Sequence, residues 1–310
     1  MKKFFFVSYL ILLSFILNQN LNSIENKIEF KIDNEIVTTI DIIKELNFLT
    51  ALSPKILELD KDKIFEISKN SVIREKIKKL EVQKFNQKLE IDKTYLKKLI
   101  MDSYSKINLE SEKEFKEYLS RFNLKFEDFK KKIIIEALWN QLIYLKFKSK
   151  INIDKEKLKK EIIKNKTQKS TSFNLSEIVF NIEESEKLEK KYKKIKEDIK
   201  EKGFENSALI YSVSGTANLG GELGWINENS INKKLKILIK KLKIGDYTKP
   251  YVVPGGFLII KLNNLKKIDK KINIEDELKK LVIIKTNQQL NQFSNIYFNK
   301  IKKDKKIEKI

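Results

Sequence analysis

The most informative chemical feature of this 310-residue chain is the absence of two reactive residue types. The sequence contains no cysteine and no histidine. Thiol nucleophiles, disulfide exchange, zinc sites built from cysteine and histidine, and histidine-based triads or proton shuttles are therefore excluded. We expect neither a cofactor nor a bound metal, and any catalysis must use other groups.

The glycines, by contrast, gather in one part of the chain. Seven of the eight lie between residues 215 and 256, and the most specific stretch there is GTANLGGELGWINENS, from Gly215 to Ser230. Neither G-x-G-x-x-G nor a glycine-lysine-serine pattern occurs, so this segment is not a phosphate-binding loop. Its glycines permit backbone angles that other residues disfavour, and we expect Trp225 to pack after the turn.

This segment resembles the signature of parvulin (PpiC-type) prolyl isomerases, with its G-G-D/E-L-G-W core. The surrounding order agrees: LSEIVF at 175–180 as a first strand, a charged helix from about 184 to 202, then Gly203-Phe204 and a short helix, and a later segment at 241–264. That later segment resembles the family's K-x-G-x-x-S-x-P-V strand and final G-x-H-I-I strand. Nearly the whole chain is similar to periplasmic SurA-type chaperones, here with a single parvulin module.

The resemblance implies where a site would lie. In the family, two histidines and a cysteine or aspartate are joined by hydrogen bonds at the floor of the site. The histidine positions correspond here to Glu177 and Phe257, and the third position to Val213 or Ser214, depending on a one-residue gap. The resemblance therefore implies Glu177 and Ser214 as the catalytic positions, with both histidines lost.

The residues that would hold the proline ring follow from the same match. They are Ile231 and Leu235, with Phe257 as a third substrate-binding candidate. Considered without the resemblance, these three are equally compatible with the ordinary core of a half-buried sheet and helix. Glu177 is then a solvated carboxylate on a strand.

The fold that must position these residues is predicted as α+β. Apolar and polar residues alternate from Ile28 to Thr39 around Asp33-Asn34, which predicts a hairpin; a helix capped by Thr38 or Thr39 then opens at Asp41. Apolar residues recurring at three and four predict a bundle of about six helices up to residue 165. Its breaks are expected at Ser53-Pro54, 89–92, 108–111, Asn123 and 151–154.

Composition divides the remainder of the chain. The polar segment KNKTQKSTS, residues 164–172, is the predicted linker, and helical spacing returns at 274–302. We therefore expect a leader at 1–23, a helical domain at 24–168, a parvulin-like α+β domain at 173–267, and a C-terminal helix within 268–310. Such an amphipathic helix needs a partner surface, so it should pack back on the bundle.

The first residues have the order of a signal peptide. Two lysines precede an apolar run from Phe4 to Leu17, and a polar stretch with Ser23 follows. This run is shorter than the roughly 18 residues of a spanning helix, so we expect export to the periplasm and cleavage near Ser23. No clean A-x-A site occurs, and a retained membrane anchor is the alternative.

The net charge of +22 in isolation suggests nucleic acid. Only Arg74 and Arg121 are arginines, however, and phosphate recognition favours the planar guanidinium, so we expect solvated lysine faces and no nucleic-acid partner. Nucleic-acid binding by an uncleaved cytoplasmic form remains a third alternative, and the leader argues against it.

Besides that third alternative, two functions are open. The first is a folding factor that binds unfolded, outer-membrane-type polypeptides. The second is an active prolyl isomerase with an apolar, histidine-free proline pocket. Closely spaced aromatic residues of the bundle could line a client groove, although at helical spacing core packing is their ordinary role: Phe115, Tyr118, Phe122, Phe126, Phe129, Trp139 and Tyr144.

Overall fold

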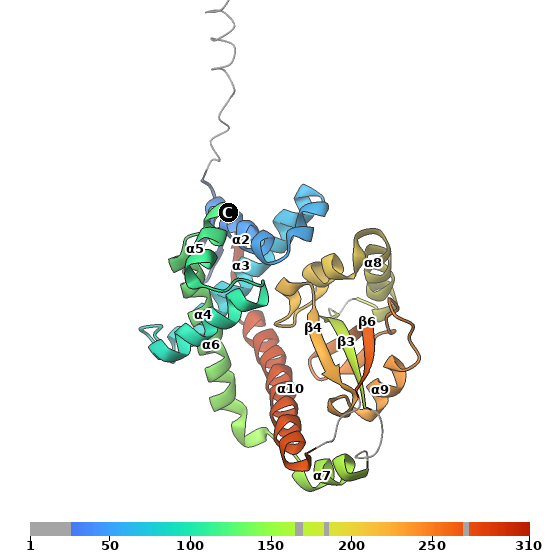
Figure 1. Ribbon diagram of the computed structural model, residues 1–310. Helices are drawn as coiled ribbons and strands as arrows, with labels where there is room; N and C mark the ends of the chain where they lie inside the picture. The colour runs from blue at the N-terminus through green and yellow to red at the C-terminus, as the bar shows by residue number, and fades with distance from the viewer. Residues whose placement is uncertain (1–25, 165–169, 183–185, 269–272) are drawn as a thin grey trace, which may run out of the picture.

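The computed structural model describes residues 26–164, 170–182, 186–268 and 273–310. These residues form a helical body, a domain with a four-stranded sheet, and a long helix α10 (Ile274–Lys303) that runs between the two (Figure 1). The expected α+β class is confirmed. The expected leader, residues 1–23, lies outside the described residues.

The body begins with the expected hairpin. Strands β1 (Ile28–Ile32) and β2 (Glu35–Thr38) are antiparallel, and Asp33 at the turn has a φ of 48°. Helix α2 (Thr39–Leu52) starts two residues before the expected Asp41. Thr38 caps it as expected: its hydroxyl accepts from the Asp41 N–H, and the Asp41 carboxylate accepts from the Thr38 N–H, so two otherwise unpaired donors are satisfied.

Six α-helices lie between residues 39 and 164 in the described chain, in agreement with the prediction. Asn108 and Asn123, with φ of 60° and 55°, follow the ends of two of them. Asparagine tolerates this left-handed conformation, which suits helix ends in a chain with few glycines. After α2 the elements are η1 (Pro54–Glu58), α3 (Lys61–Gln83), α4 (Lys93–Lys106), α5 (Glu112–Arg121), α6 (Phe126–Phe147), η2 (Lys148–Lys150) and α7 (Lys155–Lys164).

Helix α10 completes the core of the body. Ile301 is buried in the same cluster as Ile77 and Trp139, and the Trp139 indole donates to the Ser294 hydroxyl at 2.8 Å. The Trp139 ring also stacks on that of Tyr297, with centroids 5.8 Å apart. The prediction that the last helix packs back on the bundle is therefore confirmed.

The aromatic residues of α5 and α6 divide between core and surface. Phe115, Phe129 and Trp139 are at most 3% exposed, so they belong to the core of the body. Tyr144, in contrast, is exposed. Core packing, the ordinary role of aromatic residues at this spacing, is confirmed for these three.

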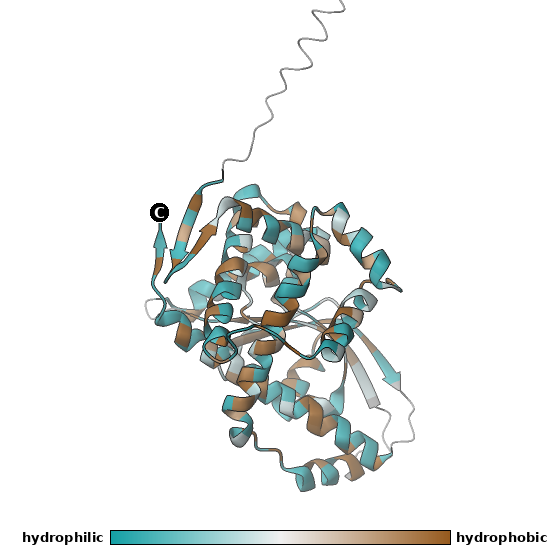
Figure 2. Ribbon diagram, turned by 90° about the vertical axis from the view of Figure 1, so that its left-hand side faces the viewer, coloured by the Kyte–Doolittle hydropathy of each residue, from teal (hydrophilic) through white to brown (hydrophobic). Residues whose placement is uncertain are grey.

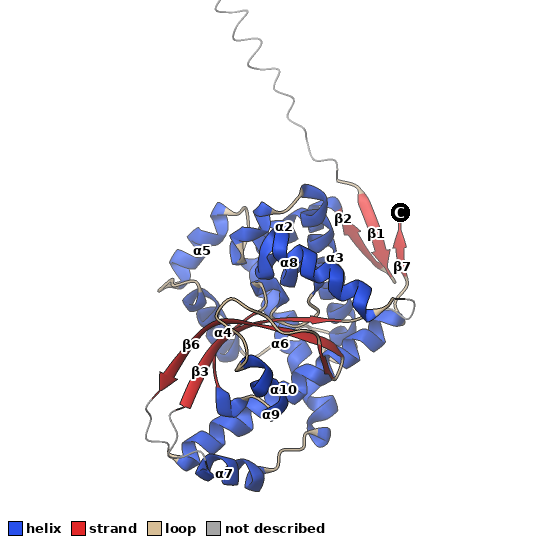
Figure 3. Ribbon diagram, turned by 90° about the vertical axis from the view of Figure 1, so that its right-hand side faces the viewer, coloured by secondary structure: helices blue, strands red, loops and turns tan. Residues whose placement is uncertain are grey.

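The sequence did not predict a short strand after α10. Strand β7 (Ile307–Lys309) pairs antiparallel with β1, which gives a sheet of order β2-β1-β7 (Figure 3). All three residues of β7 are exposed, so no apolar alternation marks it. Pairing with a distant strand determines this element.

The other sheet has the order β4-β3-β6-β5, and all of its strand pairs are antiparallel. Helices α8 and α9 lie on opposite faces of it (Figure 3). Short 3-10 turns η3 and η4 flank β4. The bounds are β3 (Ser170–Phe180), α8 (Leu188–Tyr211), η3 (Ala217–Leu219), β4 (Glu222–Asn227), η4 (Glu228–Ser230), α9 (Lys233–Ile239), β5 (Tyr251–Val253) and β6 (Gly256–Ile268).

One boundary in this domain differs from the prediction, and one predicted break is confirmed. Strand β3 begins at Ser170, so the last three residues of the predicted linker are strand; their backbone pairs with residues 266–268 of β6. Helix α8 runs to Tyr211 but is interrupted by non-helical angles at Gly203, so the predicted break at Gly203-Phe204 and the short helix after it are confirmed. At the start of β3, backbone pairing overrides a local composition typical of loops.

The sheet domain is docked on the body. Leu209 of α8 is buried among Leu49, Ile56, Leu59, Ile64 and Ile67 of the body. Around this apolar contact, Lys63 reaches Asp198 at 3.3 Å, and Lys55 reaches Glu205 at 2.8 Å. The docking therefore combines a buried leucine with two ion pairs.

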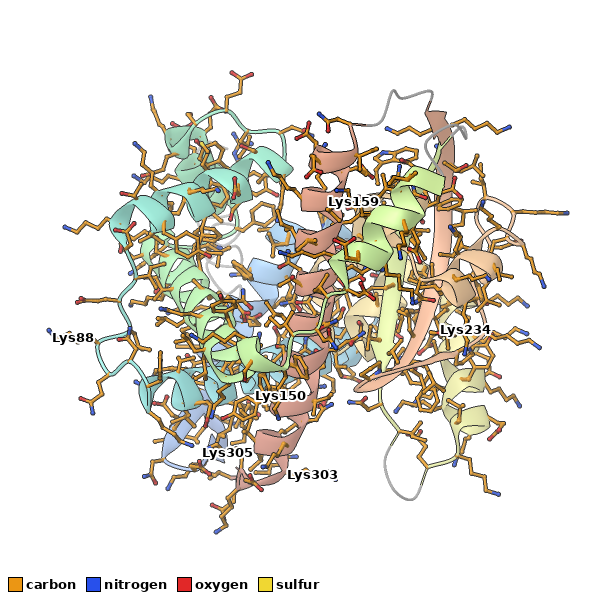
Figure 4. All side chains as sticks on the ribbon, turned by 90° about the horizontal axis from the view of Figure 1, so that it is seen from below. Lys88, Lys150, Lys159, Lys234, Lys303 and Lys305 are labelled. Carbon is orange, nitrogen blue, oxygen red and sulfur yellow. The ribbon has the colours of Figure 1, made fainter. Side chains whose placement is uncertain are left out.

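Apolar and hydrophilic residues interleave along the helices, as expected for helices with one face on a core (Figure 2). Of the helices described, none combines the length and apolarity that crossing a bilayer requires. Lysines project from both the body and the sheet domain, for example Lys88, Lys150 and Lys234 (Figure 4). The positive charge is thus spread over the described surface.

Candidate functional site

The alternation of β3 places Glu177 on the α9 face of the sheet. Leu175 and Val179 pack with Ile239 of α9, whereas Ile178 and Phe180 pack on the α8 side. Because successive side chains of a strand point to opposite faces, Glu177 faces the same way as Leu175 and Val179.

The glycine turn allows a close backbone approach beside Glu177. The Glu177 N–H donates to the Gly221 carbonyl at 2.8 Å. A Cβ on Gly221 would stand 2.1 Å from the Glu177 carbonyl oxygen, and Gly221 has a φ of +79°. Only glycine fits this position, which explains the second glycine of the motif.

Three hydroxyl groups form a chain that ends on Glu177. The Ser212 Oγ accepts from the Val179 N–H at 3.1 Å and lies 3.0 Å from the Ser214 Oγ. The Ser214 Oγ is 2.7 Å from the Thr216 Oγ1, and Thr216 donates to the Glu177 Oε1 at 2.9 Å. The turn after α8 therefore joins Ser214 to Glu177 through Thr216.

Glu177 is not the solvated carboxylate that the residues alone suggested. Its side chain is half-buried, and burial raises its pKa above the usual range. The hydrogen bonds to Thr216 and Ser214 oppose this shift, because they stabilise the ionised form, without cancelling it. The neutral form of the Glu177 carboxyl is therefore more favoured than that of a glutamate in water.

Apolar side chains lie on the same face of the sheet as Glu177. Ile231 is 8% exposed and Leu235 is half-buried, and both lie in one cluster with Val179 and Leu258. The carbonyl oxygen of the Asn232 side chain caps α9 by accepting from the Leu235 N–H at 2.9 Å. The structure therefore brings Glu177, Ser214, Ile231 and Leu235 to one face.

Phe257 does not join them. It pairs with Phe180 across β3 and β6, the two rings are 5.6 Å apart, and both lie on the α8 side. The next residue, Leu258, lies on the α9 face and is 8% exposed. Read from Gly256 instead of Gly255, the pattern G-x-H-I-I assigns Leu258 to the histidine position, so the placement of Phe257 was off by one residue.

Two further observations correct or extend the sequence analysis. Trp225 is 45% exposed, and the ammonium of Lys266 lies 4.1 Å from its ring centroid, so it does not pack into the core after the turn. Sequence reasoning missed Ser212 and Thr216; the signal that could have found them is the alternation S-x-S-x-T from 212 to 216. Within the described ranges, no three His, Cys, Asp or Glu residues are grouped as metal ligands.

The fold and this site define a class of domain. Residues 172–264 match the sequence model of the rotamase family described as the PPIC-type PPIase domain. Residues 172–264, which lie between the start of β3 and the end of β6, therefore match a PPIC-type peptidyl-prolyl isomerase domain, and the part of the chain that the structure describes holds one sheet of this kind.

Named relatives agree with this class. A chaperone SurA of Pseudomonas aeruginosa is 30% identical over 80 residues, which is 26% of this chain and 19% of that protein. The foldase protein PrsA 1 of Bacillus cereus is 28% identical over 113 residues, 36% of this chain and 40% of the relative. The similarity thus spans less than half of either protein.

A solved structure of a SurA-like chaperone from Campylobacter jejuni aligns with 92% of this chain and 99% of its own. The sequence identity is 16% and the TM-score 0.36.

Proposed function

We propose that the protein is an exported folding factor whose isomerase domain binds proline-containing segments of unfolded polypeptides and accelerates their cis–trans isomerisation without histidine. The observation that supports this most directly is the hydroxyl chain that ends on the half-buried Glu177, on the same face of the sheet as Ile231 and Leu235. In this proposal residues 173–267 are the catalytic module, residues 24–168 and 268–310 are the body, and residues 1–23 are the leader.

The reaction requires no bond cleavage. Rotation about a peptide bond passes through a twisted amide whose nitrogen has lost conjugation with the carbonyl, and uncatalysed X–Pro rotation takes tens to hundreds of seconds. A site accelerates rotation when it binds the twisted form better than the planar one. Leu235 and Ile231 would hold the proline ring, while a hydrogen-bond donor below it would stabilise the exposed nitrogen lone pair.

Glu177 is the group we propose for that donor. Thr216 donates to one carboxyl oxygen, Oε1, and a hydroxyl can donate one hydrogen bond while it accepts others. Ser212 and Ser214 can therefore orient toward Thr216, so that the chain points to Glu177. A neutral Glu177 carboxyl could then donate its own proton toward the substrate from its second oxygen.

The test is a proline-limited refolding assay with the chain from residue 24 onward. We expect acceleration that Glu177→Ala and Leu235→Asp each reduce at least tenfold, since tenfold corresponds to about 1.4 kcal/mol of transition-state stabilisation. Ile237→Asp is the matched control, because Ile237 lies on α9 as well but is 48% exposed. A wild-type chain with no acceleration, or Leu235→Asp as active as Ile237→Asp, would contradict the isomerase proposal.

A second candidate is a chaperone that binds unfolded polypeptides, including outer-membrane-type clients, without isomerising them. The names of the relatives, chaperone SurA and foldase PrsA 1, favour it. It predicts that aggregation of an unfolded outer-membrane protein is suppressed equally by the wild-type chain and by Glu177→Ala. Suppression combined with no acceleration of refolding would select this candidate over the isomerase.

Neither candidate includes nucleic acid or stable membrane insertion after cleavage of the leader. The scarcity of arginine and the spread of lysines over the body and the sheet domain support that part of the proposal (Figure 4).

A further inference from the structure

Arg74 on α3 is a partly buried cation whose hydrogen-bond acceptor belongs to the sheet domain. Its guanidinium Nη2 donates to the Ser212 carbonyl oxygen at 3.2 Å. Burial lowers its pKa, which the charges of Glu136 and Glu45 oppose. Among the described residues no carboxylate forms an ion pair with Arg74; Glu136 and Glu45 pair with lysines instead. Its hydrogen bond in this part of the chain is the one to the Ser212 carbonyl of the sheet domain.

A second contact lies at the other end of the same loop. The Asn218 Nδ2 donates to the Ser71 Oγ at 3.5 Å. Ser71 and Arg74 are three residues apart on α3, so they lie on one face of the helix. The loop from Ser212 to Asn218, which carries the hydroxyl chain to Glu177, is therefore contacted at both ends by one helix of the body.

Ser71 itself is held from the body side. Its hydroxyl donates to the Glu45 Oε1 at 2.6 Å, and Glu45 is only 2% exposed. The second Glu45 oxygen accepts from the Lys132 ammonium at 2.5 Å. A buried carboxylate that is satisfied on both oxygens fixes the hydroxyl that receives Asn218, because moving this hydroxyl would leave the buried Glu45 Oε1 without its hydrogen-bond donor.

Composition supports a specific role for Arg74. The chain has 65 lysines and arginines, of which only Arg74 and Arg121 are arginine, and Arg121 is exposed on the surface. Guanidinium is planar and less strongly hydrated than ammonium, so it suits a partly buried contact to a carbonyl. The one arginine inside the molecule therefore contacts the residue at which the hydroxyl chain begins.

We propose that Arg74 is a positioning residue for the isomerase site. Together with Ser71, it fixes the 212–218 loop so that Ser214 and Thr216 meet Glu177. The site is then complete only when its domain is docked on the helical body. The catalytic consequence rests on the isomerase activity proposed above, whereas the structural consequence does not.

Amide hydrogen exchange on the full chain tests the structural part without reference to activity. The amides of Val213, Ala217, Gly220 and Gly221 are hydrogen-bonded within the domain and should exchange slowly. In Arg74→Met we expect these amides to exchange about tenfold faster, since one hydrogen bond to a charged group is lost, while amides of β6 keep their rates. Arg121→Met is the control.

Ser71→Ala is the second variant. It removes the hydroxyl that accepts from Asn218 and keeps the Arg74 guanidinium, so it tests the same inference if Arg74→Met does not fold. It should accelerate exchange at Gly220 and Gly221 more than at Val213. Unchanged exchange from 213 to 221 in a folded Arg74→Met or in Ser71→Ala would overturn the inference, whatever the activity of the chain.

The catalytic part is measured on the same proteins. We expect the rate of isomerisation to fall about tenfold in Arg74→Met, to be partly restored in Arg74→Lys, and to stay at the wild-type level in Arg121→Met. If the wild-type chain shows no isomerase activity but Arg74→Met still exchanges these amides faster, the isomerase proposal is refuted and the positioning role of Arg74 is retained. Faster exchange with full activity would refute the catalytic importance of Arg74.

Discussion

At the residue scale, the chemistry of the site depends on the protonation of Glu177. Burial raises its pKa, and the neutral carboxyl is the form that can donate to a twisted amide. We therefore expect the isomerisation rate to fall as the pH rises through the raised pKa of Glu177. Glu177→Gln keeps a donor that does not titrate in this range, so its rate should vary less with pH. A wild-type rate that increases with pH would contradict this role.

The same group predicts a dependence of stability on pH. A folded-state pKa raised above the unfolded value of about 4.3 stabilises the fold below that value, and this contribution is lost as the pH rises through the folded pKa. We expect Glu177→Gln to gain free energy of unfolding relative to wild type as the pH increases from 4 to 8. Urea unfolding at each pH measures the difference. A constant difference would mean that Glu177 titrates alike in both states.

Gly221 provides a prediction about backbone geometry. Alanine there would place a Cβ 2.1 Å from the Glu177 carbonyl oxygen at a φ of +79°. We expect Gly221→Ala to lower the free energy of unfolding by at least about 2 kcal/mol and to abolish any isomerisation. In Gly215→Ala the new Cβ meets nothing within 4 Å, so that variant should be nearly neutral in urea unfolding.

How far the site follows from the sequence depends on the residue. The motif around Gly220 and Gly221 led to Glu177 and Ser214 as candidate positions, because a motif fixes the spacing of its neighbours, and the structure joins the two through Thr216. Phe257 was misplaced because two consecutive glycines allow two registers, and a shift of one residue moves a strand side chain to the other face. The burial of Glu177 depends on its contacts with the turn from 212 to 221. This turn is distant from Glu177 in the sequence, so no local sequence pattern predicts the burial.

At the element scale, helices were predicted better than strands. The spacing of apolar residues, the N-cap at Thr38 and the left-handed Asn123 after α5 are local features, so the bundle could be predicted from the sequence. Strand β7 and the first residues of β3 are exposed or polar, and only pairing with β1 and β6 makes them strands. Such pairing is non-local, which explains why these boundaries were missed.

Helix α10 belongs to the body through Trp139 of α6. The indole is 1% exposed, stacks on Tyr297 and donates to Ser294. We expect Trp139→Ala to lower the free energy of unfolding by about 3–5 kcal/mol, the usual cost of removing a buried aromatic side chain. Tyr144→Ala, at a position 48% exposed on the same helix, should cost much less. Equal losses in thermal or urea unfolding would show that α10 does not depend on this contact.

At the scale of the whole molecule, Leu209 joins the two domains. It belongs to α8 of the sheet domain, yet it is buried among body residues such as Leu49 and Ile56, and the α8 residues facing the sheet are others, including Phe204. A charge at position 209 would be buried without a partner when the domains are docked, whereas undocking would expose it to water. The docking, and not the fold of either domain, should therefore be lost in Leu209→Asp.

We expect Leu209→Asp to keep its helical and sheet content by circular dichroism while its radius of gyration increases in solution scattering. The amides from 213 to 221 should also exchange faster, because Arg74 can hold Ser212 only in the docked arrangement. Lys200→Asp, at an exposed position of α8, should change neither measurement. If Leu209→Asp stays as compact as wild type, the ion pairs Lys63–Asp198 and Lys55–Glu205 hold the domains without the leucine, and removing them together becomes the decisive variant.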